Sequence, residues 1–227
     1  TTLNNLKSIY LRGIKPRKWV NVNTEKYDIY DLSNPIVQKR RSEIDNITLN
    51  KVSDMNIAGG FERGKTVSVH ECVNLYFTPI NPMLYVVNQL VPNNEIVVLC
   101  VSIDLLKEAK RQYIFSNKNI ADSNAAMISN INDLNEINWD VITGEYWKNE
   151  FRGGAFEQWK EQRMAELLVY PDIGSLFIEN VLCGSKESEE KLTKIFNELI
   201  TEYPKYFSEN IFDDIWLTEQ INNTYFS

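Results

Sequence analysis

The sequence predicts one α+β domain that spans residues 1–227. Strand-like runs rich in β-branched and aromatic residues occur through the middle of the chain. The clearest amphipathic helical pattern, at residues 187–203, follows them. No internal repeat or low-complexity linker divides the sequence into parts. These observations favour one mixed core of helices and sheet.

The N-terminal segment is predicted to be a helix. Residues 2–12 place apolar side chains at helical spacing. Thr1 or Thr2 is available as the N-cap, and Gly13 is a natural residue at which the helix ends.

A short helix and a long loop are expected next. Residues 34–41 have Pro35 in the first turn, a position that proline tolerates well. Residues 45–66 are polar and contain three glycines. We therefore expect a long loop there, and long loops in compact domains are usually functional or mobile.

Two strands and a helical turn are predicted in the centre of the chain. Residues 68–77 alternate and are rich in β-branched and aromatic side chains, whereas residues 95–103 are apolar enough for a strand buried on both faces. Residues 104–112 begin with an aspartate that can serve as an N-cap, so we expect one or two helical turns.

The remaining segments alternate between irregular and regular structure. Residues 116–133 are rich in Asn, Ser and Ala and are expected to be weakly structured, with at most a short helix. Residues 138–160 are predicted to be a long aromatic-rich loop with one helical turn. Two strands, 165–170 and 176–184, precede the amphipathic helix of residues 187–203.

The composition excludes several classes of protein. The formal net charge is −7, which argues against a general nucleic-acid coat protein but is compatible with a local basic groove. The hydrophobic fraction is 43%, and no apolar run approaches the roughly 18 residues of a membrane span. Cys72, Cys100 and Cys183 are widely separated, so we expect reduced, packed thiols in a cytoplasmic protein.

Common catalytic and cofactor motifs are absent from the sequence. The chain has a single histidine, His70, which excludes an HExxH zinc site, and it contains neither a P-loop nor a GxGxxG motif. We expect no metal. His70 lies in a strand-like run, where a structural role is more common than a role as a base.

A carboxylate and a guanidinium remain as candidates for chemistry. Glu166 stands at the entrance of an apolar strand, where desolvation penalises its charged form. Arg40 and Arg41 end a short helix, and an arginine fork binds phosphates in a bidentate manner. From these residues alone, the alternative of a salt-bridged strand end and a solvated helix terminus is the stronger interpretation.

The order of four motifs resembles that of a known family, DarT, whose members are DNA ADP-ribosyltransferase toxins of bacterial DarTG toxin–antitoxin systems. The motifs are "TTLNNLKSIYLRGI" (1–14), "IVQKRR" (36–41), "VHECVNLYFTPINPMLY" (69–85) and "QRMAELLVY" (162–170). The resemblance extends over nearly the whole chain.

This resemblance implies an ADP-ribosyltransferase-like fold, with split mixed and antiparallel sheets around an NAD cleft and peripheral helices. It implies transfer of ADP-ribose from NAD⁺, as co-substrate, onto a thymine or guanine of single-stranded DNA. It also implies a DarG-like macrodomain antitoxin as partner. An NAD⁺ glycohydrolase or a protein-directed transferase on the same fold, and a non-catalytic binding module, are the alternatives.

The resemblance also implies roles for individual residues. Glu166 and Arg41 match the family's catalytic pair. The residues expected to bind the cofactor are Thr1, Thr2, Asn5, Arg41, Tyr76 and Met83.

A DNA platform is expected in the aromatic-rich segment before Glu166, because aromatic faces stack on unpaired bases and cations follow phosphates. Its best candidates are Tyr146, Trp147 and Arg152. The surrounding aromatic and basic residues that we include in it are Lys148, Phe151, Phe156, Trp159, Lys160 and Arg163. The alternative is that the aromatic residues fill the core under this loop, and we expect that of at least half of them.

Overall fold

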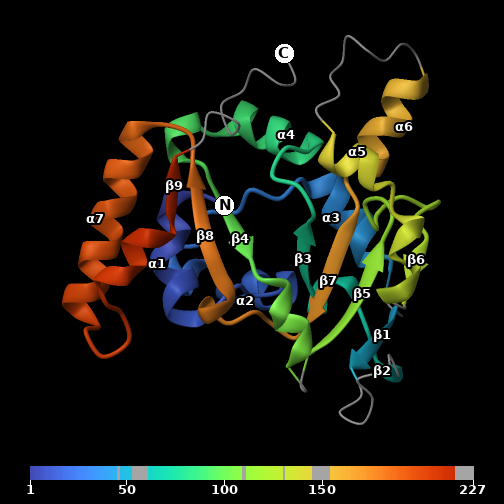
Figure 1. Ribbon diagram of the computed structural model, residues 1–227, viewed down its shortest axis with the longest axis horizontal. Helices are drawn as coiled ribbons and strands as arrows, with labels where there is room; N and C mark the ends of the chain where they lie inside the picture. The colour runs from blue at the N-terminus through green and yellow to red at the C-terminus, as the bar shows by residue number, and fades with distance from the viewer. Residues whose placement is uncertain (45–46, 53–60, 109–110, 130, 145–153, 218–227) are drawn as a thin grey trace.

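The computed structural model describes residues 1–44, 47–52, 61–108, 111–129, 131–144 and 154–217. In this part of the chain, two β-sheets stand next to each other and helices surround them (Figure 1).

The larger sheet has the strand order β2-β1-β5-β7-β3, and β6 pairs with β5. All of its strand pairs are antiparallel. The strands are β1 (Ile47–Val52), β2 (Phe61–Val67), β3 (Val73–Tyr76), β5 (Gln112–Ser116), β6 (Met127–Ile128) and β7 (Glu166–Tyr170). The register places Glu166 opposite Tyr76 on one side and Ser116 on the other. Glu166 therefore begins a strand that has a neighbour on each side.

The second sheet has the order β4-β8-β9. Its strands are β4 (Val97–Val101), β8 (Ile178–Cys183) and β9 (Ile215–Leu217). Strands β4 and β8 are antiparallel, whereas β8 and β9 are parallel. Strand β4 is an edge of this sheet and β3 is an edge of the larger one.

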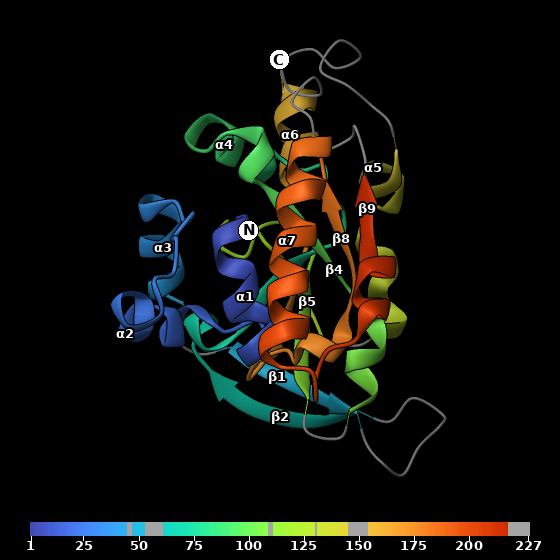
Figure 2. The same ribbon diagram turned by 90° about the vertical axis from the view of Figure 1, so that its left-hand side faces the viewer.

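Helices lie around both sheets (Figures 1 and 2). The α-helices are α1 (Leu3–Arg12), α2 (Arg17–Tyr27), α3 (Pro35–Ser42), α4 (Pro82–Leu90), α5 (Trp139–Thr143), α6 (Gly154–Gln162) and α7 (Lys186–Glu202). The short 3₁₀ helices are η1 (Val69–Glu71), η2 (Asn93–Glu95), η3 (Ile103–Lys107), η4 (Ile131–Glu136), η5 (Ser175–Phe177) and η6 (Glu209–Asp214).

Helices α1 and α7 cover the second sheet because their apolar stripes face it. Leu6 of α1 and Leu192, Phe196 and Leu199 of α7 are fully buried in one cluster with strand residues such as Val181. Burial of this kind contributes about 1.5–3 kcal/mol for each large apolar side chain. None of the described helices is long and apolar enough to cross a membrane.

Several predicted elements are confirmed. Helix α1 has Thr2 at its N-cap and ends at Gly13, whose φ of 81° suits glycine. A Cβ at Gly13 would also collide with the carbonyl oxygen of Ile173. Helices α3 and α7 and strands β7 and β8 also match their predictions. Strand β4 lies where a strand was predicted, but the expectation that it is buried on both faces is wrong, because β4 is an edge strand in which only Val97 is buried.

The prediction of a loop over residues 45–66 is wrong. Strands β1 and β2 occupy Ile47–Val52 and Phe61–Val67. Ile47 and Leu49 alternate into the core and are buried, so β1 has the period of a half-buried strand. The polar residues of segment 45–66 obscured this alternation in the sequence.

Other boundaries in the central region also differ from the prediction. The expected strand over residues 68–77 begins with η1, because Ser68 and Glu71 form a capping box, and only Val73–Tyr76 is strand. The helical turn expected over residues 104–112 is η3, which is capped by Ser102 and not by Asp104.

Five elements were assigned to irregular segments or to none. Strand β5 precedes the segment expected to be weakly structured, and α5 and α6 occupy much of the predicted loop 138–160. Helix α2 has no buried residue, which removes the amphipathic signal that would have predicted it. Helix α4 begins with an Asn81 cap and Pro82, a start signal that the sequence analysis did not use.

Candidate functional site

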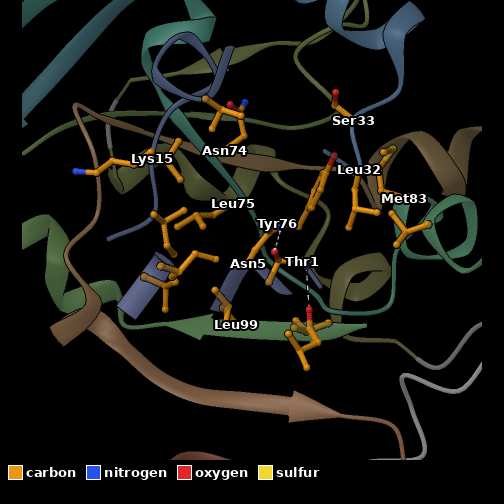
Figure 3. Close-up of a pocket in the computed structure, with 18 of the residues that line it drawn as sticks. Thr1, Asn5, Lys15, Leu32, Ser33, Asn74, Leu75, Tyr76, Met83 and Leu99 are labelled. Carbon is orange, nitrogen blue, oxygen red and sulfur yellow. Dashed lines mark hydrogen bonds between the residues drawn. The ribbon is translucent and has the colours of Figure 1, made fainter. Parts of the chain in front are cut away.

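A cavity of about 680 Å³ lies where the edge strands β3 and β4 face each other. Helix α1, the segment 29–33 and the beginning of α4 complete its wall. Figure 3 shows residues from these elements gathered around it. Volumes of about 300–1,000 Å³ are typical of sites for small molecules and cofactors.

Arg41 and Glu166 form a buried ion pair next to this cavity. The Nη2 atom of Arg41 donates to Oε1 of Glu166 across 125 positions of sequence. Glu166 has 0% and Arg41 has 7% of its surface exposed. Arg41 is the buried residue of α3, whereas its neighbour Arg40 is exposed. The phase of this helix therefore selects the second arginine of the pair.

Asn74 holds the other oxygen of the Glu166 carboxylate. Because Glu166 is opposite Tyr76 and Leu168 is opposite Asn74, these polar side chains share one face of the sheet. The Nδ2 atom of Asn74 donates to Oε2 of Glu166 at 3.1 Å. Asn74 and Tyr76 also line the cavity. The carboxylate of Glu166 therefore lies directly behind the cavity wall and is hydrogen-bonded to it through Asn74.

Burial raises the pKa of Glu166 above the ordinary range of a glutamate. The charge of Arg41 and hydrogen bonds from Asn74, from Tyr76 and from the backbone of Ile120 oppose this shift. Burial also raises the pKa of Tyr76 well above that of a free phenol, and the nearby Glu166 charge adds to the shift. Tyr76 therefore remains a neutral hydrogen-bonding group at physiological pH.

Four of the residues expected to bind the cofactor line the cavity: Thr1, Asn5, Tyr76 and Met83. The side chain of Asn5 is already bonded to the backbone of Tyr30 in both directions, at 2.8 Å each, and donates to Oγ1 of Thr1 at 3.2 Å (Figure 3). Thr2 is buried at the start of α1 and is outside the cavity lining.

The expected DNA platform is only partly described. Tyr146, Trp147 and Arg152, together with Lys148 and Phe151, lie outside the described residues. Trp159 and Arg163 are buried, with 2% and 3% of their surfaces exposed. Trp159, on α6, is one of the aromatic residues that fill the core, whereas including Arg163, which follows α6, in the platform was wrong because its side chain is buried.

Arg163 is bonded to backbone carbonyls from two segments. Its Nε donates to the carbonyl of Ile80 at 2.6 Å, and Nη1 donates to those of Val141 at 2.7 Å and Gly144 at 2.9 Å. Its guanidinium also lies over the ring of Trp159, 5.2 Å from the centroid. The residue therefore ties the end of α5 to the segment that precedes α4.

The sequence analysis missed two polar residues of the site, Asn74 and Asn119. Asn119 accepts from Nη2 of Arg41 at 3.3 Å and donates to the hydroxyl of Tyr76 at 3.4 Å. A signal was available for Asn74, since an amide inside the apolar run of β3 needs a partner. We find no comparable signal for Asn119, which lies in a polar segment.

Two of the three cysteines, Cys72 and Cys183, are packed in the interior as predicted, and Cys100 is half-buried. Cys72, Cys100 and Cys183 are all free thiols. Burial raises the pKa of Cys72 to about 12, so this thiol stays protonated although it lines the cavity. Among the described residues, no cluster of three or more His, Cys, Asp or Glu side chains could hold a metal ion.

Comparison with known sequences finds a protein family whose model matches most of the chain. A family model described as "ssDNA thymidine ADP-ribosyltransferase, DarT" matches residues 1–212. A DNA ADP-ribosyl transferase of Thermus sp. (strain 2.9) is 24% identical over 135 residues, which are 57% of this chain and 62% of the relative. Another, from Escherichia coli O127:H6, is 24% identical over 127 residues, 53% of this chain and 56% of the relative. The chain thus matches less than two thirds of the length of these relatives.

Solved structures with the same fold are of DarT proteins. Thermus sp. 2.9 DarT in complex with ADP-ribosylated ssDNA has a TM-score of 0.70 at 19% identity, covering 98% of this chain and 93% of that one. The complex of the same DarT with NAD⁺ has a TM-score of 0.64 at 20% identity, covering 98% and 94%. Thermosipho africanus DarTG in complex with ADP-ribose has a TM-score of 0.68 at 23% identity, covering 97% and 49%. These similarities confirm the predicted ADP-ribosyltransferase fold.

Proposed function

Because this chain belongs to the DarT family, we propose that it transfers ADP-ribose from NAD⁺ onto a base of single-stranded DNA. The observation that carries the proposal is the buried Arg41–Glu166 pair beside a cavity of about 680 Å³. The relatives named DNA ADP-ribosyl transferases, and the DarT complexes with NAD⁺ and ADP-ribosylated ssDNA, support it. A single transferase domain over residues 1–227 remains part of this proposal.

Glu166 is the proposed catalytic carboxylate. Breaking the bond between C1′ of the ribose and nicotinamide builds positive charge on the ribose, and a fixed carboxylate lowers that barrier. The nicotinamide leaves with the bonding electron pair, and a nitrogen of the acceptor base forms the new bond to C1′. Glu166 accepts the proton that this nitrogen loses. The site thus supplies charge stabilisation and a base with one side chain.

Arg41 is the proposed phosphate clamp. Its guanidinium is paired with Glu166, and both groups are withdrawn from solvent. Arginine carries five N–H donors in a fixed fork, so an NAD⁺ diphosphate can share this guanidinium with the carboxylate. Arg41 then neutralises the diphosphate while it stays against Glu166. Thr1, Thr2, Asn5, Tyr76 and Met83 remain the proposed cofactor-binding residues, and four of them line the cavity.

We propose thymidine as the acceptor, because the matching family is described as thymidine-specific. Single-stranded DNA is favoured over duplex, since a paired base has to be extruded before chemistry. We also propose a DarG-like macrodomain antitoxin as partner, on the basis of the DarTG relative. The protein would act in the cytoplasm, where NAD⁺ and DNA are both present. Tyr146, Trp147 and Arg152 remain the proposed DNA contacts.

Mass spectrometry of short oligonucleotides tests the proposal. The protein is incubated with NAD⁺ and with single-stranded oligonucleotides that contain or lack thymine, and duplexes of the same sequences serve as controls. We expect the mass of one ADP-ribose on the thymine-containing single strands only. An adduct on guanine would change the acceptor but not the reaction, whereas absence of any DNA adduct would refute the proposal.

The alternatives on the same fold have distinct products. An NAD⁺ glycohydrolase releases nicotinamide and free ADP-ribose whether or not DNA is present. A protein-directed transferase labels a protein extract and leaves oligonucleotides unmodified. A non-catalytic binding module releases no nicotinamide with any acceptor. Measuring nicotinamide release in parallel with the DNA adduct separates these outcomes.

A further inference from the structure

The turn after β5 reaches the Arg41–Glu166 pair from a third side. Ser116, the last residue of β5, lies opposite Glu166 in the sheet and is fully buried. Its hydroxyl donates to the carbonyl of Lys118 at 2.6 Å, and the amide of Asp122 donates to the carbonyl of Asn119 at 2.8 Å. The turn is therefore fixed by its own hydrogen bonds, and it presents Asn119 to the ion pair.

The side chain of Asn119 has a fixed orientation and connects two elements. Its Oδ1 accepts from the amide of Ala121 at 2.9 Å, which sets the amide so that Oδ1 also faces Nη2 of Arg41. Its Nδ2 then faces the hydroxyl of Tyr76. The residue is 9% exposed and is outside the cavity lining. It contacts Arg41 of α3 and Tyr76 of β3, and it lies behind the cavity wall as Arg41 and Glu166 do.

From this geometry we propose that Asn119 is a positioning residue of the transferase site, which holds Arg41 against Glu166 and aligns Tyr76. This inference rests on the proposed function. Nη2 of Arg41 is shared between Glu166 and Asn119, so the amide fixes the direction from which the guanidinium approaches the carboxylate. The same amide supplies the donor for the Tyr76 oxygen, which leaves the phenolic hydrogen for Glu166.

The first test removes the contact. Asn119→Ala leaves Arg41 paired with Glu166 but free to tilt, and leaves the oxygen of Tyr76 without its donor. Hydrogen bonds to charged groups are strong enough that we expect kcat/KM for oligonucleotide modification to fall about ten- to a hundredfold. Asn124→Ala is the matched control, because Asn124 lies in the same segment and is exposed. Unchanged activity in Asn119→Ala would overturn the proposal.

The second test uses charge. Asn119→Asp has the same size and places a carboxylate between Arg41 and Tyr76. Glu166 shares Arg41 with this position, and Lys118 and Asp122 are the charged groups of the same turn. A second anion that shares Arg41 disfavours the charged form of Glu166. We expect the acid limb of the pH–rate profile to move to higher pH. Asn124→Asp adds the same charge at an exposed position and should leave the limb in place.

A packing role for Asn119 predicts a different result. It would lower stability, which thermal unfolding measures, but it would leave the acid limb of Asn119→Asp where it is in the wild type. An acid limb at the same pH in Asn119→Asp and in the wild type would overturn the proposal even if the total activity fell.

A third measurement does not depend on transferase activity. Nitrogen-15 NMR of arginine side chains reports how fast each guanidinium rotates, and the Arg41 signal is assigned by its loss in Arg41→Lys. We expect slow rotation in the wild type and faster rotation in Asn119→Ala. Equal rotation in both would refute the positioning role. If the wild type modified no DNA while the Arg41 signal changed as expected, the proposed function would fail and the link between Asn119 and Arg41 would stand.

Discussion

Arg41 and Arg163 are both buried arginines, but the groups that accept their hydrogen bonds differ. Arg41 is bonded to the carboxylate of Glu166 and to the amide of Asn119. Arg163 is bonded to backbone carbonyls, and burial lowers its pKa from the ordinary value of arginine. A carboxylate can change its protonation state and a carbonyl cannot. The first site can therefore respond to a ligand or to pH, whereas the second is a fixed structural connection.

The comparison predicts that changes at the two sites affect different measurements. At the Arg41 site, activity should change more than stability, because the carboxylate acts on the transition state. At the Arg163 site, stability should change more than activity, because the guanidinium satisfies carbonyls of the scaffold. Variants at each site test this difference between effects on activity and effects on stability.

The largest effect is expected for Glu166→Gln. The variant keeps the shape of the side chain but removes its charge, so kcat for oligonucleotide modification should fall about 10²- to 10³-fold, roughly 3–4 kcal/mol of transition-state stabilisation. Glutamine is preferred to alanine because its side-chain oxygen can still accept the hydrogen bond from the buried Arg41, which alanine cannot do. Glu179→Gln, on an exposed position of β8, is the control. Activity within fivefold of the wild type, read by mass spectrometry, would exclude Glu166 as the catalytic carboxylate.

Arg163→Met is expected to have the next largest effect, and on stability. It leaves the carbonyls of Ile80, Val141 and Gly144 without their donor, and the free energy of unfolding should fall by about 3 kcal/mol. Urea unfolding followed by circular dichroism measures it. Lys160→Met, in the helix that ends just before Arg163, removes an exposed pair with Glu157 and should cost less than about 0.5 kcal/mol. Equal stability of both variants would refute the structural role of Arg163.

A smaller effect on activity is expected for Arg41→Lys. The charge is kept but the planar fork is lost, so the side chain can no longer donate hydrogen bonds to a carboxylate, an amide and a phosphate together. We expect kcat/KM to fall about 10- to 100-fold, roughly 1.4–2.7 kcal/mol. Arg40→Lys alters the exposed neighbour and should leave kcat/KM within twofold. If Arg41→Lys and Arg40→Lys lost activity equally, burial of Arg41 by α3 would not determine which of the two arginines acts in the reaction.

The smallest effect is a shift in the pH–rate profile. Burial raises the pKa of Glu166, and the reaction needs the ionised carboxylate, so activity should be present above this raised pKa and fall as pH drops through it. The acid limb of kcat/KM should therefore lie above the pH at which an exposed glutamate titrates. Arg163→Met should leave the limb unchanged. A limb at the ordinary glutamate value would show that Glu166 is not desolvated in the working enzyme.

Local sequence predicted the elements that carry their own signal. The cap and glycine stop of α1, the proline start of α3 and the stripe of α7 are all set by residues within a few positions of each other. The two members of the ion pair were also named from sequence, because their motifs resemble those of a family. Strand β1 and helix α2 were missed, since one is masked by polar residues and the other buries none of its own.

Tertiary structure alone decided which polar side chains meet. Asn119 bonds to Arg41 across 78 positions, and Asn74 bonds to Glu166 across 92. The pairing of β3 and β5 with β7 brings Asn74 and the turn that carries Asn119 next to Glu166, and helix α3 adds Arg41. Burial of Arg163 is likewise set by elements far from it in sequence. A sequence determines helices through neighbours a turn apart, but the environment of a charge depends on everything that the fold places around it.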